Sequence, residues 1–410
     1  MYVRRSAAVL AAVTVIGTAA PAVAADPTPS ASPSQAFPAA LYGGTDPTYD
    51  GVWRQSLALL AQNTVDVQPA TKSVDWLLGQ QCATGAFAPY RADTSAACDA
   101  KTPVDTNNTA AAVQALAALG GHDAATGKAV SWLKSVQNKD GGWGYAAGGA
   151  SDANSTSVVI GALAAVGEKP AEVVKGGKSP YDALLKLALP CDGDGAGAFA
   201  FQPDKKGALS ANADATAAAV LGALGKGMPV GAGKPASADC TDTGDRTPER
   251  AAANGAAYLT QALSKDGHLT SAMPGAKDQP DYGNTADAVV ALAAQGGAAA
   301  ARKPLRWLEQ NSAQWAAKSG PAAYAQLIFA AHATGTDPRD FGGTDLVEQL
   351  NSTGPAPRSA AASGRASEKP AAKRVADGGG VSVWWIVGVG LVAGIGIGFL
   401  LSGRNKGKRP

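Results

Sequence analysis

The chain has 410 residues, of which 46% are hydrophobic, so it is long enough to bury one large core or two ordinary ones. Its formal net charge of +2 is close to neutral, which argues against a nucleic-acid-binding protein. Alanine and glycine are abundant, and we expect a mostly helical protein.

The N-terminus has the pattern of a secretory signal peptide over residues 1–24. Two arginines precede an apolar run from Ala7 to Ile16, and a small-residue cleavage site ends at Ala24. An uncleaved anchor is the alternative, but the apolar run is short for a membrane span. Residues 25–40 follow as a Pro/Ser/Ala-rich linker that could not bury a core.

Two helix types alternate between residues 41 and 353. The first type ends with an aromatic or apolar residue beside leucine and then a Gly-rich turn, as in "VDWLLGQQCATGAF" and "VSWLKSVQNKDGGWGY". The second type opens with small polar residues and runs Ala-rich to a glycine, as in "NNTAAAVQALAALGG" and "NSTSVVIGALAAVG". The terminal glycines of the second type are Gly120, Gly167, Gly225, Gly296 and Gly335. Their uneven spacing indicates two-helix units separated by loops of variable length.

The alternation predicts two layers of helices. Second-type helices are apolar on several faces, which is typical of buried helices, whereas first-type helices are amphipathic, with Lys128 close to Trp132. A leading helix near Val52–Gln62 and a trailing helix near Thr344–Leu350 bring the total to twelve. We therefore expect an all-α fold, an α/α toroid of about six inner and six outer helices over residues 41–353. An open solenoid is the alternative, and it would require polar capping repeats.

Four cysteines lie in this exported region, and we expect them to form two structural disulfides. Four cysteines allow three pairings, and pairing neighbours along the sequence joins Cys82 to Cys98 and Cys191 to Cys240. Metal ligation is the alternative, but export favours oxidation and no CxxC pair exists.

The C-terminus has the pattern of a membrane anchor. Residues 354–380 form a flexible stalk, and Val381–Leu401 is an uncharged run within a predicted transmembrane helix, 381–402. The basic tail, 403–410, is expected to stay in the cytoplasm. We therefore expect a single-pass plasma-membrane protein with its folded domain outside the cell.

The turn "QNKDGGWG", which begins at Gln137 and is followed by a small-residue helix, resembles the repeat of squalene cyclases and prenyltransferase β-subunits. The same toroid is found in the cobalamin carriers transcobalamin and intrinsic factor. The resemblance covers about residues 70–335. It implies the toroid fold and says little about activity.

The resemblance also implies that the starts of the inner helices surround one mouth of the toroid. We expect a ligand to contact polar and aromatic residues at these starts and in the Gly-rich turn. The candidates are Asp105, Thr106, Asn107, Asn108, Trp143, Tyr145, Asp152, Asn154, Asn212, Asp214, Tyr282, Asn284, Asp287, Tyr324 and Gln326. N-capping of the helices is the alternative role for each of them.

The catalytic motifs of the related enzymes are incomplete. Squalene–hopene-type cyclases use Asp-x-Asp-Asp-Thr-Ala, whereas residues 105–110 read "DTNNTA", which keeps only the first acid. The chain lacks a DDxxD cluster for Mg²⁺ and a clear zinc-ligand set, so we predict no metal site and expect no prenyl transfer. Glycosidase chemistry is an alternative, because Asp105, Asp152, Asp214 and Asp287 could face one another.

The segment that begins at Val104, "VDTNNTAAAVQALAAL", resembles in part the "VDTA" helix start of the cobalamin carriers. A mouth of amides and hydroxyls suits the amide-edged corrin ring. We therefore expect a non-catalytic surface receptor for cobalamin or another corrinoid, which feeds a membrane transporter. No β-rich second domain follows, and the cobalt-binding histidine of some carriers has no clear counterpart, so a partner chain would complete the site. A peptide, a glycan or a lipid is the alternative ligand. A terpenoid-cyclase-like enzyme and a structural surface protein are the other hypotheses.

Overall fold

The computed structural model describes residues 37–235, 239–242, 244, 246–271 and 279–359. The predicted signal peptide, most of the first linker, the stalk beyond residue 359, the predicted membrane helix and the basic tail lie outside these residues. Among the helices that are described, none combines the length and the apolar character needed to cross a membrane.

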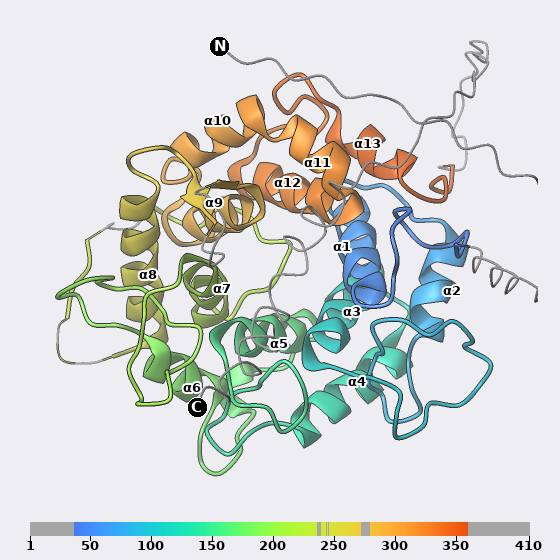
Figure 1. Ribbon diagram of the computed structural model, residues 1–410, viewed down its shortest axis with the longest axis horizontal. Coiled ribbons are helices and arrows are strands. Elements are labelled where there is room, and N and C mark those ends of the chain that lie inside the picture. The colour runs from blue at the N-terminus through green and yellow to red at the C-terminus, as the bar shows by residue number, and fades with distance from the viewer. Residues whose placement is uncertain (1–36, 236–238, 243, 245, 272–278, 360–410) are drawn as a thin grey trace, which may run out of the picture. The chain divides into compact units, whose positions relative to one another are not determined.

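Six helices form a closed inner ring. Each helix contacts the next, and the last contacts the first, as Figure 1 shows. In ring order they are α1 (Gly51–Thr64), α3 (Thr106–Leu119), α5 (Ala153–Ala165), α7 (Ala213–Ala223), α9 (Tyr282–Gly296) and α12 (Pro321–Thr334). The contact between α12 and α1 excludes an open solenoid and confirms the predicted toroid.

The outer layer surrounds this ring. It comprises α2 (Thr71–Gly79), α4 (Asp123–Ser135), α6 (Pro180–Leu187), α8 (Pro248–Ala262), α10 (Arg302–Asn311), α11 (Ala313–Ser319) and α13 (Leu346–Ser352). Two helices, α10 and α11, separated at Ser312, lie where a single helix was expected. The described outer layer therefore has seven helices instead of six. A 3₁₀ turn (Pro170–Glu172) and a two-residue hairpin, β1 (Leu269–Thr270) with β2 (Pro280–Asp281), complete the regular structure of the described residues.

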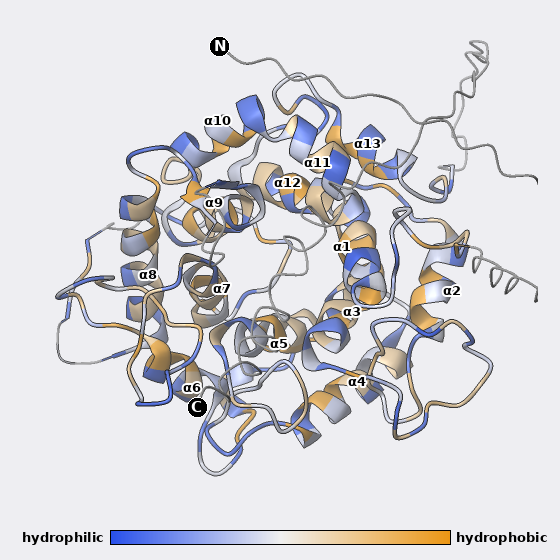
Figure 2. Cartoon of the chain, viewed as in Figure 1, coloured by the Kyte–Doolittle hydropathy of each residue, from blue (hydrophilic) through white to orange (hydrophobic). Residues whose placement is uncertain are grey.

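The two layers differ in polarity as predicted. Figure 2 shows hydrophilic residues on the outer helices, whereas the inner helices are buried on most faces. Small side chains allow the inner helices to approach closely. At Gly222 on α7, an added Cβ would lie 2.5 Å from the hydroxyl oxygen of Ser157 on α5. The alanine and glycine content of the sequence is therefore a requirement of inner-ring packing.

The Gly-rich turn that follows an outer helix packs against the next outer helix of the layer. Gly85, after α2, has a φ of +96°, and a Cβ there would lie 2.2 Å from the carbonyl oxygen of Lys128 on α4. Gly141, after α4, has a φ of +92°, and a Cβ would lie 2.1 Å from the carbonyl oxygen of Ser179, the N-cap of α6. At both positions the positive φ and the lack of room for a Cβ atom exclude residues other than glycine, which explains why the Gly-rich turn is repeated.

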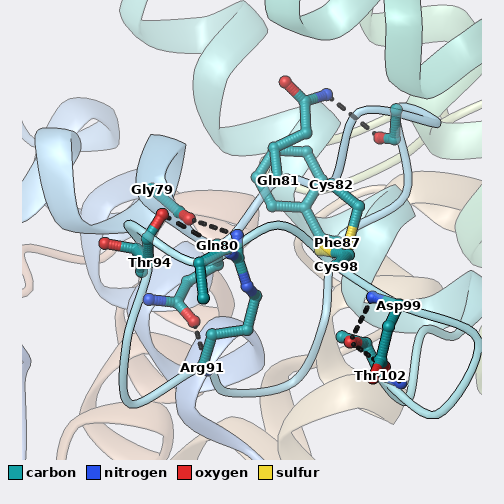
Figure 3. Close-up of a disulfide and its surroundings, with 12 residues drawn as sticks. Gly79, Gln80, Gln81, Cys82, Phe87, Arg91, Thr94, Cys98, Asp99 and Thr102 are labelled. Atoms are coloured by element: carbon teal, nitrogen blue, oxygen red, sulfur yellow. Dashed lines mark hydrogen bonds between the residues drawn. A yellow bond between two sulfur atoms is a disulfide. The ribbon is translucent and has the colours of Figure 1, made fainter.

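Two disulfides hold the longer loops. Cys82–Cys98 and Cys191–Cys240 are both formed, which confirms the expected pairing. Figure 3 shows the first of them beside Arg91, whose guanidinium donates to the carbonyl oxygen of Gly79 over 3.0 Å. The loop between α2 and α3 is thus fixed by one covalent bond and by hydrogen bonds to the end of α2.

The two ends of the folded region meet at the seam where the ring closes. The amide of Gly43 donates to the carbonyl oxygen of Thr353 over 2.9 Å. The hydroxyl of Tyr42 donates to Gln62 Oε1 over 2.9 Å, and Gln62 Nε2 donates to Asn351 Oδ1 over 2.7 Å. We call this group of residues the clasp, since it joins the first and last segments of the toroid.

Candidate functional site

Four inner helices begin with the same five-residue pattern. It reads "DTNNT" from Asp105, "DANST" from Asp152, "NADAT" from Asn212 and "DYGNT" from Asp281. In each, the first side chain accepts a hydrogen bond from the amide three residues later, over 2.7, 2.6, 2.9 and 3.1 Å respectively. The first residue of the pattern is therefore an N-cap. Asp281, the cap of α9, was not among the residues predicted at the mouth.

The fifth residue of the pattern is a threonine with a structural role. Its hydroxyl accepts a hydrogen bond from the backbone amide of the residue that ends the preceding turn. The four pairs are Phe87 with Thr109, Trp143 with Thr156, Phe199 with Thr216, and Leu269 with Thr285, at 2.9 to 3.1 Å. These threonines were not among the residues predicted at the mouth. Alignment of the four helix starts with one another would have shown that they share the threonine.

The third residue of the pattern is left for another role. It is Asn107 in α3, Asn154 in α5, Asp214 in α7 and Gly283 in α9, and none of these residues caps its helix. Asn154 Nδ2 donates to Asp214 Oδ2 over 2.9 Å, so the side chains of neighbouring helices meet. Asn107 Oδ1 and Asn154 Oδ1 are buried and have no hydrogen-bond partner among the described residues.

A second pair of inner helices adds a carboxyl and an amide one turn deeper. Asp287 on α9 accepts from Gln326 Nε2 on α12, with the nitrogen 3.1 and 3.3 Å from the two carboxyl oxygens. Asp214 and Asp287 keep partial access to solvent although they lie on inner helices. We call the third-position residues together with Asp287 and Gln326 the rim residues.

The rim carboxyls hold protons more strongly than an exposed aspartate does. Burial raises the pKa of Asp214 to about 6; the hydrogen bond from Asn154 opposes this increase, and the negative charges of Asp281 and Asp152 add to it. Burial, followed by the charge of Asp214, raises the pKa of Asp287 to about 7. These carboxyls therefore lie close enough to interact electrostatically, and Asp287 exchanges a proton near neutral pH.

Asp105 and Tyr145 form a further polar contact at the start of α3. The hydroxyl of Tyr145 donates to Asp105 Oδ2 over 3.4 Å, and Asn108 Nδ2 donates to the same oxygen over 2.8 Å. Burial raises the pKa of Asp105 to about 6, and these hydrogen bonds oppose that increase. Burial likewise raises the pKa of Asp152 to about 6. Tyr145 remains 38% exposed, so it is the accessible member of this group.

Several predicted site residues are buried or pack against other parts of the fold, and their role in a site stays a prediction. Trp143 is only 1% exposed, and its ring nitrogen donates to the carbonyl oxygen of Leu133 over 2.7 Å, so it belongs to the core. Tyr324 and Thr106 are also buried. Tyr282 stacks between two tryptophan rings of α10 and α11. Asn284 donates to the cap of its own helix.

A segment after α7, Lys226–Pro235, lies across the C-terminal part of the inner ring. The amide of Met228 donates to Gln114 Oε1 on α3 over 3.0 Å, and the amide of Gly233 donates to the carbonyl oxygen of Ala293 on α9 over 2.8 Å. Figure 1 shows this connection passing within the outline of the ring. The N-terminal ends of the inner helices, where the rim residues lie, are on the opposite side of the ring.

Within the described part of the chain, no group of three or more His, Cys, Asp or Glu residues is placed to hold a metal ion. The rim instead offers amide oxygens that accept hydrogen bonds and carboxyls that both accept and donate when protonated. Such a set suits a neutral polar ligand that has hydrogen-bond donors.

Residues 53–186 match the family described as "Prenyltransferase alpha-alpha toroid domain". The match covers the first three inner helices and the outer helices between them. Together with the closed ring of helices, it supports the toroid superfamily that the sequence predicted. It does not extend to the cobalamin-carrier branch.

Several solved structures are similar to this chain. An ent-copalyl diphosphate synthase from Streptomyces platensis is 15% identical over 70% of this chain, with a TM-score of 0.47, and the match spans only half of the synthase. A protein from Actinoplanes is 16% identical, with a TM-score of 0.46 over 74% of this chain and 96% of its own. A glycosidase variant is 15% identical, with a TM-score of 0.44 over 73% and 93%. No curated protein sequence matches the chain. At such scores, the likenesses carry no argument about activity.

Proposed function

We propose that this protein is a non-catalytic ligand-binding protein of the cell surface, and that its ligand is cobalamin or another corrinoid. One observation supports this function above the others. Three buried amide oxygens, those of Asn107, Asn108 and Asn154, have no hydrogen-bond partner among the described residues. The side chains are only 4%, 3% and 5% exposed. A buried acceptor without a partner costs about 1–3 kcal/mol, which favours a ligand that donates hydrogen bonds to it.

A corrinoid has the chemistry that these acceptors require. Its ring is edged with primary amides, which donate hydrogen bonds, and its breadth suits a site assembled from several helices. In this proposal the signal peptide exports the chain and the helix at 381–401 tethers it to the plasma membrane. A partner chain covers the bound ligand, and a membrane transporter receives it.

Retention of cyanocobalamin by the full chain tests the proposal. The protein is purified in mild detergent, incubated with the ligand and desalted, and we expect it to keep a corrinoid absorption spectrum. Replacing Asn107 and Asn154 together with alanine should weaken retention at least tenfold without loss of helicity, because neither residue is a cap. The matched control, Asp105→Ala, removes a cap and should lower thermal stability. The proposal fails if no corrinoid is retained at micromolar concentration, or if the double variant retains it normally.

An acid–base enzyme such as a glycosidase is the second candidate, and one specific observation favours it. Asp214 and Asp287 interact electrostatically, with pKa values raised to about 6 and about 7. Carboxyls that differ in protonation near neutral pH can serve as general acid and general base. Turnover of an oligosaccharide by the full chain, lost in Asp287→Asn, would replace the receptor proposal with this one.

A further inference from the structure

A cavity of about 250 Å³ lies in the outer layer, away from the rim, next to the Cys191–Cys240 disulfide. One wall follows the end of α6 and the residues after it, and the other follows the start of α8. The lining includes apolar Leu185 and Leu189 and two cations, Arg246 and Arg250. Both leucines are partly exposed, so the apolar walls can be reached from solvent.

The two arginines of this cavity are not committed to other groups. Neither guanidinium donates a hydrogen bond or forms an ion pair with a described residue, and Arg250 Nε is buried without a partner. An unpaired donor on a charged group is costly to bury, and the cost is removed when an anion occupies it. The guanidinium fork matches the two oxygens of a carboxylate.

The single carboxylate in the cavity does not neutralise these arginines. Asp242 Oδ2 accepts a hydrogen bond from the amide of Cys191 over 2.6 Å, which directs it to the loop joined by the disulfide. The cavity lining thus has two cations and one anion. Asn254 also lines the cavity. Its side-chain oxygen accepts from the amide of Thr241 and its side-chain nitrogen donates to the carbonyl oxygen of Thr241, so both polar atoms already have partners.

We propose that this cavity binds a carboxylate attached to a short branched apolar group. Arg246 and Arg250 hold the carboxylate, and Leu185 and Leu189 pack against the apolar group. Two sources share this chemistry: the C-terminal end of a peptide whose last residue is aliphatic, and a free branched-chain carboxylic acid. The site is separate from the rim and does not depend on the function proposed for it.

Calorimetric titration of the full chain with matched acids and amides tests the proposal. N-acetyl-leucine represents a chain end and 4-methylpentanoate a free acid, and the corresponding amides are the uncharged controls. We expect saturable binding of at least one acid, with affinity that falls as salt is added, and no binding of either amide. The acid that binds more tightly identifies the source.

Variants then locate the binding. Arg250→Met keeps the apolar stem but removes the charge, and should weaken acid binding at least tenfold. Arg250→Lys keeps the charge without the fork, and should give an intermediate loss. Arg306→Met, on the exposed surface of α10, is the matched control and should leave the affinity unchanged. Equal binding of acids and amides, or normal binding by a folded Arg250→Met protein, would overturn the proposal.

Discussion

Replacing Asp287 with asparagine isolates the energetic effect of a partly buried carboxyl in the inner ring. The change keeps the size of the side chain and an oxygen that accepts from Gln326, but the new group cannot ionise. The pKa of Asp287 in the folded protein is raised from its ordinary value of 3.8 to about 7, mainly by burial. Between these two values the folded protein holds a proton that the unfolded chain has released. Stability therefore falls as the pH rises through this interval.

The size of this change in stability follows from the pH interval between the two pKa values of Asp287. Each pH unit between the two pKa values changes the free energy of unfolding by about 1.4 kcal/mol. Only the two units between about pH 5 and the folded-state pKa of about 7 contribute when the pH is raised from about 5 to about 8. Ionisation of Asp287 should therefore lower the free energy of unfolding by about 3 kcal/mol when the pH is raised over this range. The asparagine variant should lose that part of the pH dependence and be more stable than the unmodified chain at about pH 8.

Denaturant unfolding of the full chain at the two pH values, with disulfides intact, measures the difference. The matched control is Asp266→Asn, at an exposed position, which should leave the pH dependence unchanged. If the unmodified protein and Asp287→Asn lose the same stability between the two pH values, the buried carboxyl is not the cause. The assignment of Asp287 to an enclosed environment would then be wrong.

Two further substitutions test the repeated pattern itself. Thr156→Val should lower the free energy of unfolding by about 1–3 kcal/mol, because the buried amide of Trp143 loses its acceptor, whereas Thr156→Ser should restore most of the stability. Gly141→Ala should destabilise the protein by several kcal/mol, since the new methyl group would overlap the backbone of Ser179. Gly148→Ala is its control: this glycine has a similar positive φ but open space around it, so only backbone strain of about 1 kcal/mol is expected. Equal losses at the two glycines, measured by denaturant unfolding, would show that the close approach at Gly141 is unimportant.

The sequence was sufficient to predict the two layers of helices, because helix polarity and the positions of caps are local properties. The Ala-rich second-type segments form the inner helices, and the cysteines that are neighbours along the sequence form the two disulfides. The local sequence pattern predicted the ends of the helices less accurately. Gly296 was predicted to terminate α9, but the helix includes it, and Gly297 has the positive φ that ends the helix.

The rim residues could be predicted only in part, because contacts between helices that are far apart in sequence determine which side chains come together there. The residues predicted there included caps, core residues and four side chains that bond to a neighbouring inner helix, and single-position reasoning could not separate these roles. Comparison of the four repeated starts would have identified the first and fifth positions as structural. The meeting of Asp287 with Gln326 depends on the packing of neighbouring inner helices, and the course of Lys226–Pro235 depends on contacts with both α3 and α9; no local pattern contains either.

The clasp has a mechanical consequence. Because Gly43 is bonded to Thr353 at the seam of the ring, the chain leaves the toroid at the same place where it enters it. Arg358, beyond the last helix, is bonded to the backbone of Gln68 and Pro69, next to the same seam. A pulling force applied to the chain after residue 359 would therefore load these few bonds before it reached any helix, and the toroid would yield first by separation of its two ends.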